Sequence, residues 1–201
     1  MAEGEKKVKI NGKVIVAGPA AAGKTCLIER FVNDVYSGEE GPTLGVDCQR
    51  KSVFIDNTEV HLFLYDTAGQ ERFANMQQSY YRLGEVCLLC FDLSELSSFD
   101  NTVWWHKKVQ EAKNDIGFVL VGCKEDKIAD SQVNISKIVE WAEEKGMPYF
   151  PTSSLKGGGP VKFLFHTVGE KIMRMNLEKR LNEKNGLKLG EDDGSKKKGC
   201  C

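Results

Sequence analysis

Eight residues near the start of the chain, GPAAAGKT at positions 18–25, have the types and spacing of a phosphate-binding loop. Glycines let the backbone curl so that successive N–H groups point at an anion, and the lysine can reach the β and γ phosphates of a nucleotide. The threonine hydroxyl is suited to binding Mg²⁺. Phosphate and nucleotide contacts are expected from Gly18, Ala21, Ala22, Gly23, Lys24, Thr25 and Cys26.

A second stretch with chemical potential, YDTAGQERF at positions 65–73, begins at the end of an apolar run. The acidic residue there, Asp66, can hold the Mg²⁺ shell, and Gly69 can offer its N–H group to a γ-phosphate. Gln70 is then placed to orient a water molecule, which makes it the candidate catalytic residue. Together the two stretches predict a nucleoside triphosphate site, but they do not distinguish ATP from GTP.

Apolar runs of strand length alternate with helical periodicity, which predicts an α/β fold with a mostly parallel sheet covered by helices on both faces. Six runs read as strands: VKINGKVIVAG, residues 46–55, residues 59–65, EVCLLCFDL, GFVLVGC and MPYFPTS. The second and third are joined by DNT, an expected hairpin that places one antiparallel strand at an edge. Helices are expected over KTCLIERFVNDV and near 97–113, 135–145 and 160–181.

Composition limits the classes of protein to consider. The chain has 201 residues, 41% hydrophobic and 28% charged, with a net charge of −1, so no overall field would draw it to nucleic acid. No signal peptide is recognisable, and no run approaches the roughly 20 apolar residues of a membrane-spanning helix. A cytoplasmic protein is expected, with one domain over residues 1–178 and a flexible tail over 179–201, where periodicity is lost.

DTAGQE after such a strand, with GPTLGVD between it and the phosphate loop, resembles the small GTPase superfamily. GVD, QERF, YYR and the Cys-Cys pair at the end of the sequence resemble its Rab branch. The resemblance implies the small GTPase fold and a GTP/GDP switch that regulates vesicle traffic and hydrolyses GTP slowly. It identifies Thr43 as the switch I threonine, so that Mg²⁺ would be held by Thr25, Thr43 and Asp66, and it places Gly69 and Gln70 in switch II.

The base-reading segment departs from the family pattern Asn-Lys-x-Asp, because LVGCKEDK supplies Cys123, Lys124 and Asp126. A carboxylate can accept from the N–H groups of guanine, and adenine has no such donors there, so Asp126 favours guanine. Losing the asparagine amide removes polar contacts worth about 1–3 kcal/mol if they are buried.

A second departure affects the same base. The Ser-Ala-Lys loop of the family aligns with Ser153, Ser154 and Leu155, so its packing lysine is missing unless Lys156 takes that place. Together the departures predict a GTP/GDP site with weakened affinity and faster nucleotide exchange.

Two regions bear on partners. The aromatic triad of the family's switch surface maps onto Cys48, Tyr65 and Tyr80, with Phe73 on the same effector surface. Phenylalanine is usual at the first position and tryptophan at the second, so the effectors are expected to differ from those of better-matched members.

The sequence KKKGCC resembles the double-cysteine end that Rab proteins have geranylgeranylated, at Cys200 and Cys201. Two lipid chains and three lysines would give stable membrane anchoring. The resemblance implies an exchange factor, a GTPase-activating protein, a GDP-dissociation inhibitor, a prenylation escort and GTP-dependent effectors. A monomer is expected to cycle between the cytoplasm and the cytosolic face of an intracellular membrane.

Two alternatives stay open. A P-loop ATPase or nucleotide kinase is opposed by Lys124 and Asp126 after a strand. A nucleotide-poor interaction module, a pseudo-GTPase, would keep the fold while Cys123 and Leu155 have destroyed base binding.

The remaining cysteines, tryptophans and histidines suggest no further site. Five cysteines are expected as reduced packing thiols in apolar surroundings, namely Cys26, Cys48, Cys87, Cys90 and Cys123. Packing or surface roles are expected for Trp104, Trp105 and Trp141, and solvated or packed roles for His61, His106 and His166.

Overall fold

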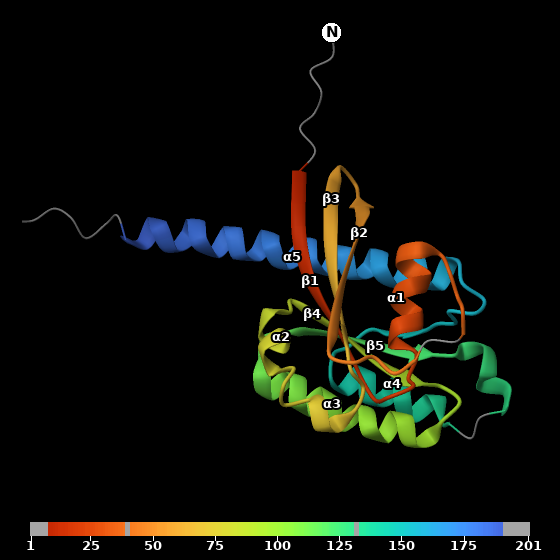
Figure 1. The fold of residues 1–201 in the computed structure, drawn as a ribbon. Coiled ribbons are helices and arrows are strands. Elements are labelled where there is room, and N and C mark those ends of the chain that lie inside the picture. Colours follow the sequence, from red (N-terminus) through yellow and green to blue (C-terminus); the bar gives the residue numbers. More distant parts are fainter. Residues whose placement is uncertain (1–7, 39–40, 131–132, 191–201) are drawn as a thin grey trace, which may run out of the picture.

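The computed structural model describes residues 8–38, 41–130 and 133–190 and shows a six-stranded sheet between two layers of helices (Figure 1). The strands are β1 (Val8–Ala17), β2 (Val46–Ile55), β3 (Thr58–Thr67), β4 (Val86–Asp92), β5 (Gly117–Cys123) and β6 (Tyr149–Pro151). The helices are α1 (Lys24–Asn33), α2 (Gln78–Leu83), α3 (Leu96–Ala112), α4 (Ile135–Glu144) and α5 (Gly159–Gly190), with short 3₁₀ turns at Glu71–Phe73 and Glu125–Asp130.

The sheet has the strand order β2-β3-β1-β4-β5-β6, and only the β2–β3 pair is antiparallel. The hairpin turn begins at Asp56, whose φ of 50° is left-handed, a conformation that aspartate tolerates better than most residues. The predicted α/β fold with one antiparallel edge strand is confirmed. All the parallel strands end at one edge, which is where such sheets bind ligands.

Alternating side chains of the strands supply two separate cores. Ile10, Val14 and Val16 of β1 pack with α1 and α5, while Ile15 and Ala17 face α2, α3 and α4. The Phe31 ring of α1 stacks on Phe165 of α5 with centroids 3.8 Å apart. Strand β4 is buried along its whole length, as expected for a strand that helices cover on both faces, and its last residue, Asp92, is buried as well.

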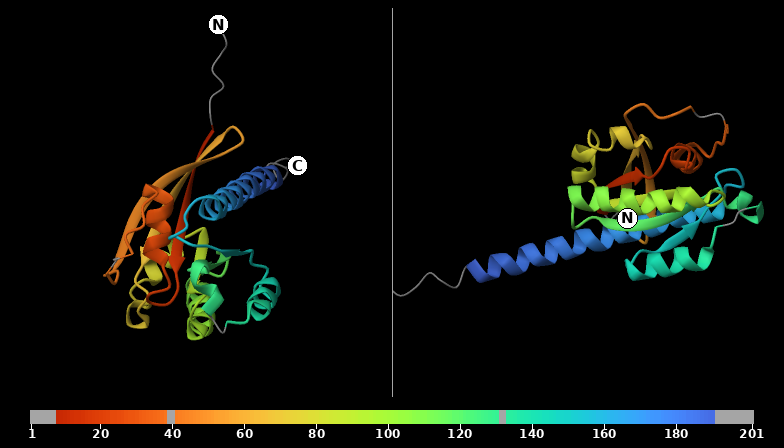
Figure 2. Two further views of the ribbon diagram at one scale, coloured as in Figure 1. Left: turned by 90° about the vertical axis from the view of Figure 1, so that its right-hand side faces the viewer. Right: turned by 90° about the horizontal axis from the view of Figure 1, so that it is seen from below.

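The last helix is longer than its sequence suggests. Helix α5 continues to Gly190, nine residues past the expected end near Leu181, and projects beyond the rest of the fold (Figure 2). Residues 179–190 contain no proline and include three leucines and three lysines, which favour helix, and a single interior glycine costs only about 1 kcal/mol. The expectation of a linker from residue 179 is therefore wrong for these twelve positions.

The cysteine and tryptophan expectations are partly confirmed. Cys87, Cys90 and Cys123 are buried free thiols, but Cys48 is exposed and Cys26 only half-buried, so the apolar surroundings expected for those two are wrong. Trp105 is fully buried and Trp104 lies at the surface. Over the described ranges, none of the helices combines the length and the apolar character that crossing a bilayer requires.

Candidate nucleotide-binding site

A cavity of about 470 Å³ opens at the carboxyl edge of the sheet. Five segments enclose it: the loop between β1 and α1, residues 36, 38 and 41–43, the turn after β3, the turn after β5 and the turn after β6. Most of the predicted nucleotide residues line it: Ala21, Gly23, Lys24, Thr25, Cys26, Thr43, Gly69, Gln70, Cys123, Lys124, Asp126, Ser154 and Leu155.

Four predicted residues lie behind the cavity wall. Gly18 and Ala22 shape the loop backbone, and Ala22 is fully buried in the core beneath it. Asp66 and Ser153 are also buried, 3% and 4% exposed, and act by holding residues of the wall.

The phosphate loop wraps around the ammonium group of its own lysine. Lys24 is only 5% exposed, and its Nζ donates to the carbonyl oxygens of Gly18 and Pro19 at 3.0 and 2.8 Å. Burial lowers the pKa of Lys24, and the charge of Asp66 opposes that effect. A cation held this way at the start of α1 is well placed to attract a phosphate group.

A cluster of oxygen ligands adjoins Lys24. The Thr25 hydroxyl donates to Oδ2 of Asp66 at 2.6 Å and lies 3.0 Å from the Thr43 hydroxyl, which is itself 3.4 Å from Oδ2. The other carboxylate oxygen, Oδ1, is buried without a hydrogen-bond partner among the described residues. Burial raises the pKa of Asp66, although the Thr25 hydroxyl and Lys24 act against the shift.

This cluster fits a small hard cation. Two hydroxyls and a carboxylate with a free, buried oxygen form the all-oxygen donor set that Mg²⁺ prefers. Over the described ranges, His, Cys, Asp and Glu side chains form no group of three suited to a metal. The oxygen atoms of Thr25, Thr43 and Asp66 are hard donors, which suit Mg²⁺ better than a transition metal.

The two predicted switch segments contact each other and the phosphate loop. The N–H group of Ala68 donates to the carbonyl oxygen of Gly45 at 3.1 Å. A methyl group on Gly69 would lie 2.5 Å from the backbone nitrogen of Ala20, so only glycine allows this approach. The amide oxygen of Gln70 accepts from Nε of Arg72 at 2.8 Å.

The base side of the cavity is organised by two hydrogen bonds. Ser153 donates to Asp126 at 2.5 Å and fixes its carboxylate, and Lys124 donates to Asp92 at 2.6 Å. Although burial opposes it, the bond from Lys124 lowers the pKa of Asp92.

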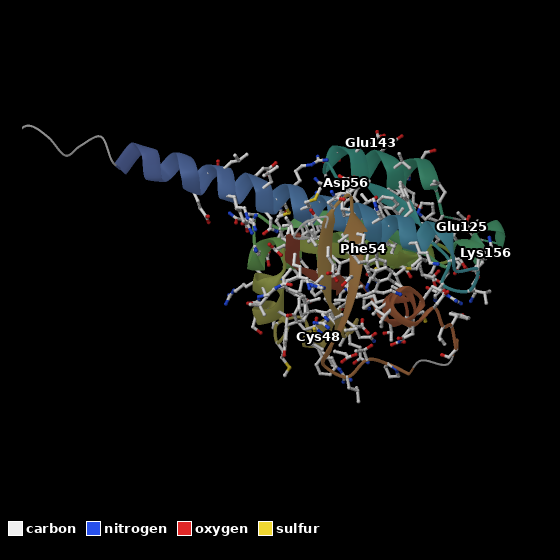
Figure 3. The ribbon with its side chains drawn as sticks, turned by 90° about the horizontal axis from the view of Figure 1, so that it is seen from above. Cys48, Phe54, Asp56, Glu125, Glu143 and Lys156 are labelled. Carbon is white, nitrogen blue, oxygen red and sulfur yellow. The ribbon has the colours of Figure 1, made fainter. Side chains whose placement is uncertain are left out.

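The two departures from the family pattern are both at this wall. Cys123 is 3% exposed and belongs to the same buried cluster as Cys90. The neighbouring Cys123 thiol and burial hold the pKa of Cys90 well above its usual range. Leu155 lines the cavity and is 55% exposed. Lys156 does not replace the missing lysine, because its Nζ pairs with Glu125 at 3.2 Å on the surface (Figure 3).

Three supporting residues were missed by the sequence reading. Arg30 of α1 donates from Nε to the carbonyl oxygen of Ser154 at 2.7 Å and so joins the phosphate side to the base side. Gln77 donates to the carbonyl oxygen of Ala68 and steadies switch II. Of these three residues, only Asp92 could have been found from the sequence, because it is an acidic residue at the end of a parallel strand, where such sheets bind ligands.

The predicted effector residues lie on one surface beside the cavity. Cys48 is paired with Tyr65 across the β2–β3 ladder, and the Tyr65 and Tyr80 rings have centroids 6.2 Å apart. Cys48, which Figure 3 labels, is exposed on β2, and Tyr80 is exposed on α2. Phe73 is half-buried beneath the guanidinium group of Arg72.

Comparison with known proteins agrees with this geometry. The model of the Ras family matches residues 13–174. The chain belongs to the Ras family. Because relatives of this GTPase carry Rab names, it is placed with the Rab-type small GTPases, which hydrolyse GTP to GDP and act as GTP-binding switches in vesicle traffic.

Three relatives show the extent of the likeness. Ras-related protein Rab-7a of Dictyostelium discoideum is 30% identical over 97% of this chain and 98% of that protein. Human Rab-30 is 32% identical over 94% of each chain. Mouse Rab-37 is 34% identical over 81% of this chain and 74% of its own.

The phosphate loop of this GTPase carries backbone strain at Ala21, whose φ is 58°. A left-handed residue with a Cβ atom costs about 1–2 kcal/mol, partly offset by the greater chain entropy of glycine. We expect Ala21→Gly to raise the free energy of unfolding of the GDP-loaded protein by about 0.5–1 kcal/mol. Chemical denaturation of the two GDP-loaded proteins measures this difference in the free energy of unfolding.

The matched control is Ala22→Gly, because Ala22 is a neighbouring alanine that is buried and has no positive φ. That change should lower stability. If Ala21→Gly also lowers it, the strain assigned to Ala21 is wrong.

Proposed function

We propose that this GTPase is a Rab-type switch with a loosened guanine site, which exchanges nucleotide faster than a member with the full base-reading pattern. The observation that carries the proposal is the wall around Asp126. Its carboxylate is held for guanine by Ser153, while the neighbouring Cys123 and Leu155 provide neither the amide nor the lysine stem of the family pattern.

The carboxylate supports guanine over adenine. Asp126 can accept from two guanine N–H groups, whereas adenine would leave a buried acceptor facing another acceptor. Lys124, held by Asp92, is positioned to pack its stem against the base.

The thiol of Cys123 is the reason to expect a lower affinity for guanine nucleotide. An asparagine amide both donates and accepts, so it can join two loops, but a thiol is a weak donor and a weak acceptor. The Cys123 side chain is 3% exposed and packs in the buried core that also holds Cys90. The phosphate side keeps its full set of groups, so binding is weakened rather than lost.

The switch would operate through the contacts around Asp66. A bound triphosphate with Mg²⁺ favours the closed arrangement of Thr43 and Gly69, and loss of the γ-phosphate releases both segments. Gln70 is the residue that would orient the attacking water, and its amide oxygen is engaged by Arg72. Over the described ranges no arginine lines the cavity. Slow intrinsic hydrolysis is therefore proposed, with a partner's arginine supplying about 10³–10⁵ in rate.

Mg²⁺ would be held by Thr25, Thr43 and Asp66, where it supplies charge that neutralises the phosphates. The folded protein raises the pKa of Asp66, so the folded state binds this proton more tightly than the unfolded chain. Without metal, stability should therefore decrease as pH rises from the unfolded pKa towards the folded pKa.

Asp66→Asn removes the cost of the buried charge. We expect this variant, in EDTA at pH 7, to melt at a temperature equal to or higher than that of the unaltered protein. It should lose the stabilisation that MgCl₂ gives to the GDP-loaded protein. Thermal unfolding with and without MgCl₂ measures both effects, and an undiminished response to Mg²⁺ would refute the assignment.

The experiment that tests the function is the nucleotide content of the purified, untagged protein. We expect chromatography after denaturation to find GDP or GTP at near-stoichiometric amounts. ATP or ADP instead would favour an ATPase or kinase. A protein that is empty and stays folded in EDTA would favour the pseudo-GTPase alternative.

Restoring the family residues should tighten the base site. For the double change Cys123→Asn and Leu155→Lys, we expect GDP dissociation to slow by roughly ten- to a hundredfold, which corresponds to about 1–3 kcal/mol of recovered contacts. A fluorescent GDP analogue reports the rate. Leu181→Lys makes the same charge change at an exposed leucine on α5 and is the control. An unchanged dissociation rate would contradict the loosened site.

Membrane attachment is a further part of the proposal. Cys200 and Cys201 lie outside the described residues, and their geranylgeranylation rests on the sequence KKKGCC. Mass spectrometry of the protein from eukaryotic cells should find both thiols prenylated, and unmodified cysteines would contradict this.

Regulators and effectors are proposed by likeness to the Rab relatives. Effectors should bind the surface formed by Cys48, Tyr65, Phe73 and Tyr80 in the GTP-bound state. Cys48 is exposed and smaller than the aromatic residue usual at this position, so it offers an effector less apolar surface beside the Tyr65–Tyr80 pair.

A further inference from the structure

A second cavity, of about 790 Å³, lies between α3, α4 and the amino end of β5, with α5 at its rim. It shares no lining residue with the nucleotide cavity, which lies at the other end of β5. Figure 2, seen from below, shows α3 and α4 lying beside each other on this side of the sheet. Its volume is in the range of small-molecule sites, about 300–1,000 Å³.

Aromatic rings form much of the wall. Trp104 comes from α3, Phe118 from β5 and Trp141 from α4. Between them lies His106, whose ring centroid is 4.4 Å from that of Phe118 and 5.5 Å from that of Trp141. These faces come from three separate elements, so the fold itself builds a surface for a flat apolar group.

Lysines surround this aromatic wall. Lys107, Lys145 and Lys171 line the cavity, against a single acidic residue, Asp100. Lys145 pairs with Glu144 at 2.9 Å. Among the described residues, Lys107 and Lys171 have no ion-pair or hydrogen-bond partner. The local charge therefore favours an anion.

The position of the Lys171 side chain depends on a glycine in β5, Gly117. A methyl group on Gly117 would lie 2.4 Å from Cε of Lys171, so the lysine stem crosses the strand where any other residue would obstruct it. Gly117 is itself fixed by its N–H group, which donates to the carbonyl oxygen of Glu85 at 3.0 Å.

His106 contributes a neutral polar group rather than another charge. Burial, and then the nearby Lys145, lower the pKa of His106, so its ring is uncharged at pH 7. An uncharged imidazole has one donor and one acceptor nitrogen.

We propose that this cavity binds a small organic anion with a planar apolar ring. The ring lies against Trp104, Phe118 and Trp141, and the anionic group lies between the ammonium groups of Lys107 and Lys171. Two features favour a small molecule over a protein segment: the volume, and the presence of two lysines unpaired among the described residues, Lys107 and Lys171, beside the aromatic rings of one open hollow. The site is independent of the guanine site.

The test uses full-length protein loaded with GDP and Mg²⁺, so that phosphate-bearing probes are kept from the nucleotide cavity. The probes are 1-naphthyl phosphate, 1-naphthol and inorganic phosphate. We expect saturable one-site binding of 1-naphthyl phosphate, at least roughly tenfold tighter than either half-probe, because each lacks the ring or the anion. The indole N–H resonances of Trp104 and Trp141 should shift, while that of buried Trp105, which does not line the cavity, should move least.

Two variants locate the anion. The pair Lys107→Ala and Lys171→Ala should weaken 1-naphthyl phosphate binding at least tenfold. Lys137→Ala with Lys162→Ala removes the same charge from α4 and α5 outside the cavity and should leave binding within about twofold. Gly117→Ala, which displaces Lys171 without removing charge, should weaken binding several-fold.

Three outcomes would overturn the proposal: no saturable binding of 1-naphthyl phosphate, equal binding of 1-naphthol, or equal losses in the two lysine pairs. Displacement of GDP by the probe would assign the binding to the nucleotide cavity and would also overturn it. None of these outcomes bears on the nucleotide content that tests the proposed function.

Discussion

The structure of this GTPase depends on two opposite charges buried beside each other at the carboxyl edge of the sheet. Lys24 is held by carbonyl oxygens of its own loop, and Asp66 is held by hydroxyl groups of Thr25 and Thr43. Burial disfavours the charged form of each group. Burying these two charges without a ligand costs free energy. A phosphate group can pair with Lys24 and a divalent cation can pair with Asp66, so ligands of high charge would offset that cost.

The phosphate half and the base half of the cavity are supported differently. The phosphate half depends on β1 and β3, which pair over nine consecutive residues and carry the loop and Asp66 at their ends. The base half depends on β5 and the short β6, which pair over only three. Arg30 connects the halves through the carbonyl oxygen of Ser154. The departures from the family pattern at Cys123 and Leu155 lie in the half that β5 and β6 support, apart from the phosphate loop.

Strand β5 joins the nucleotide cavity to the second cavity. Its carboxyl end supplies Cys123 to the first, and its amino end supplies Gly117 and Phe118 to the second. The strand between them is buried and fixed by β4 on one side and β6 on the other. The two hollows are thus rigidly placed at opposite ends of one element, although their chemistry differs.

Local pattern in the sequence predicted the strands, the helices other than the short α2 (Gln78–Leu83), the antiparallel edge strand and the chemistry of the phosphate loop. This worked because hydrophobic periodicity reports which faces are buried, and a glycine-rich turn before a helix has few other uses. Cys48 could not be read correctly in this way, because it lies on the edge strand β2, where local pattern does not show whether a side chain is covered. The end of α5 was also misjudged, because loss of periodicity marks loss of packing rather than loss of helix.

Only the tertiary structure decided which polar groups meet. The Lys124–Asp92 pair and the Arg30–Ser154 bond join residues 32 and 124 positions apart, and no local pattern encodes them. The second cavity also could not be predicted from local pattern, because its aromatic rings and lysines come from four separate elements, α3, β5, α4 and α5. Sequence alone states which groups a chain possesses, whereas their pairing follows from strand order and helix packing, which are set by the whole core.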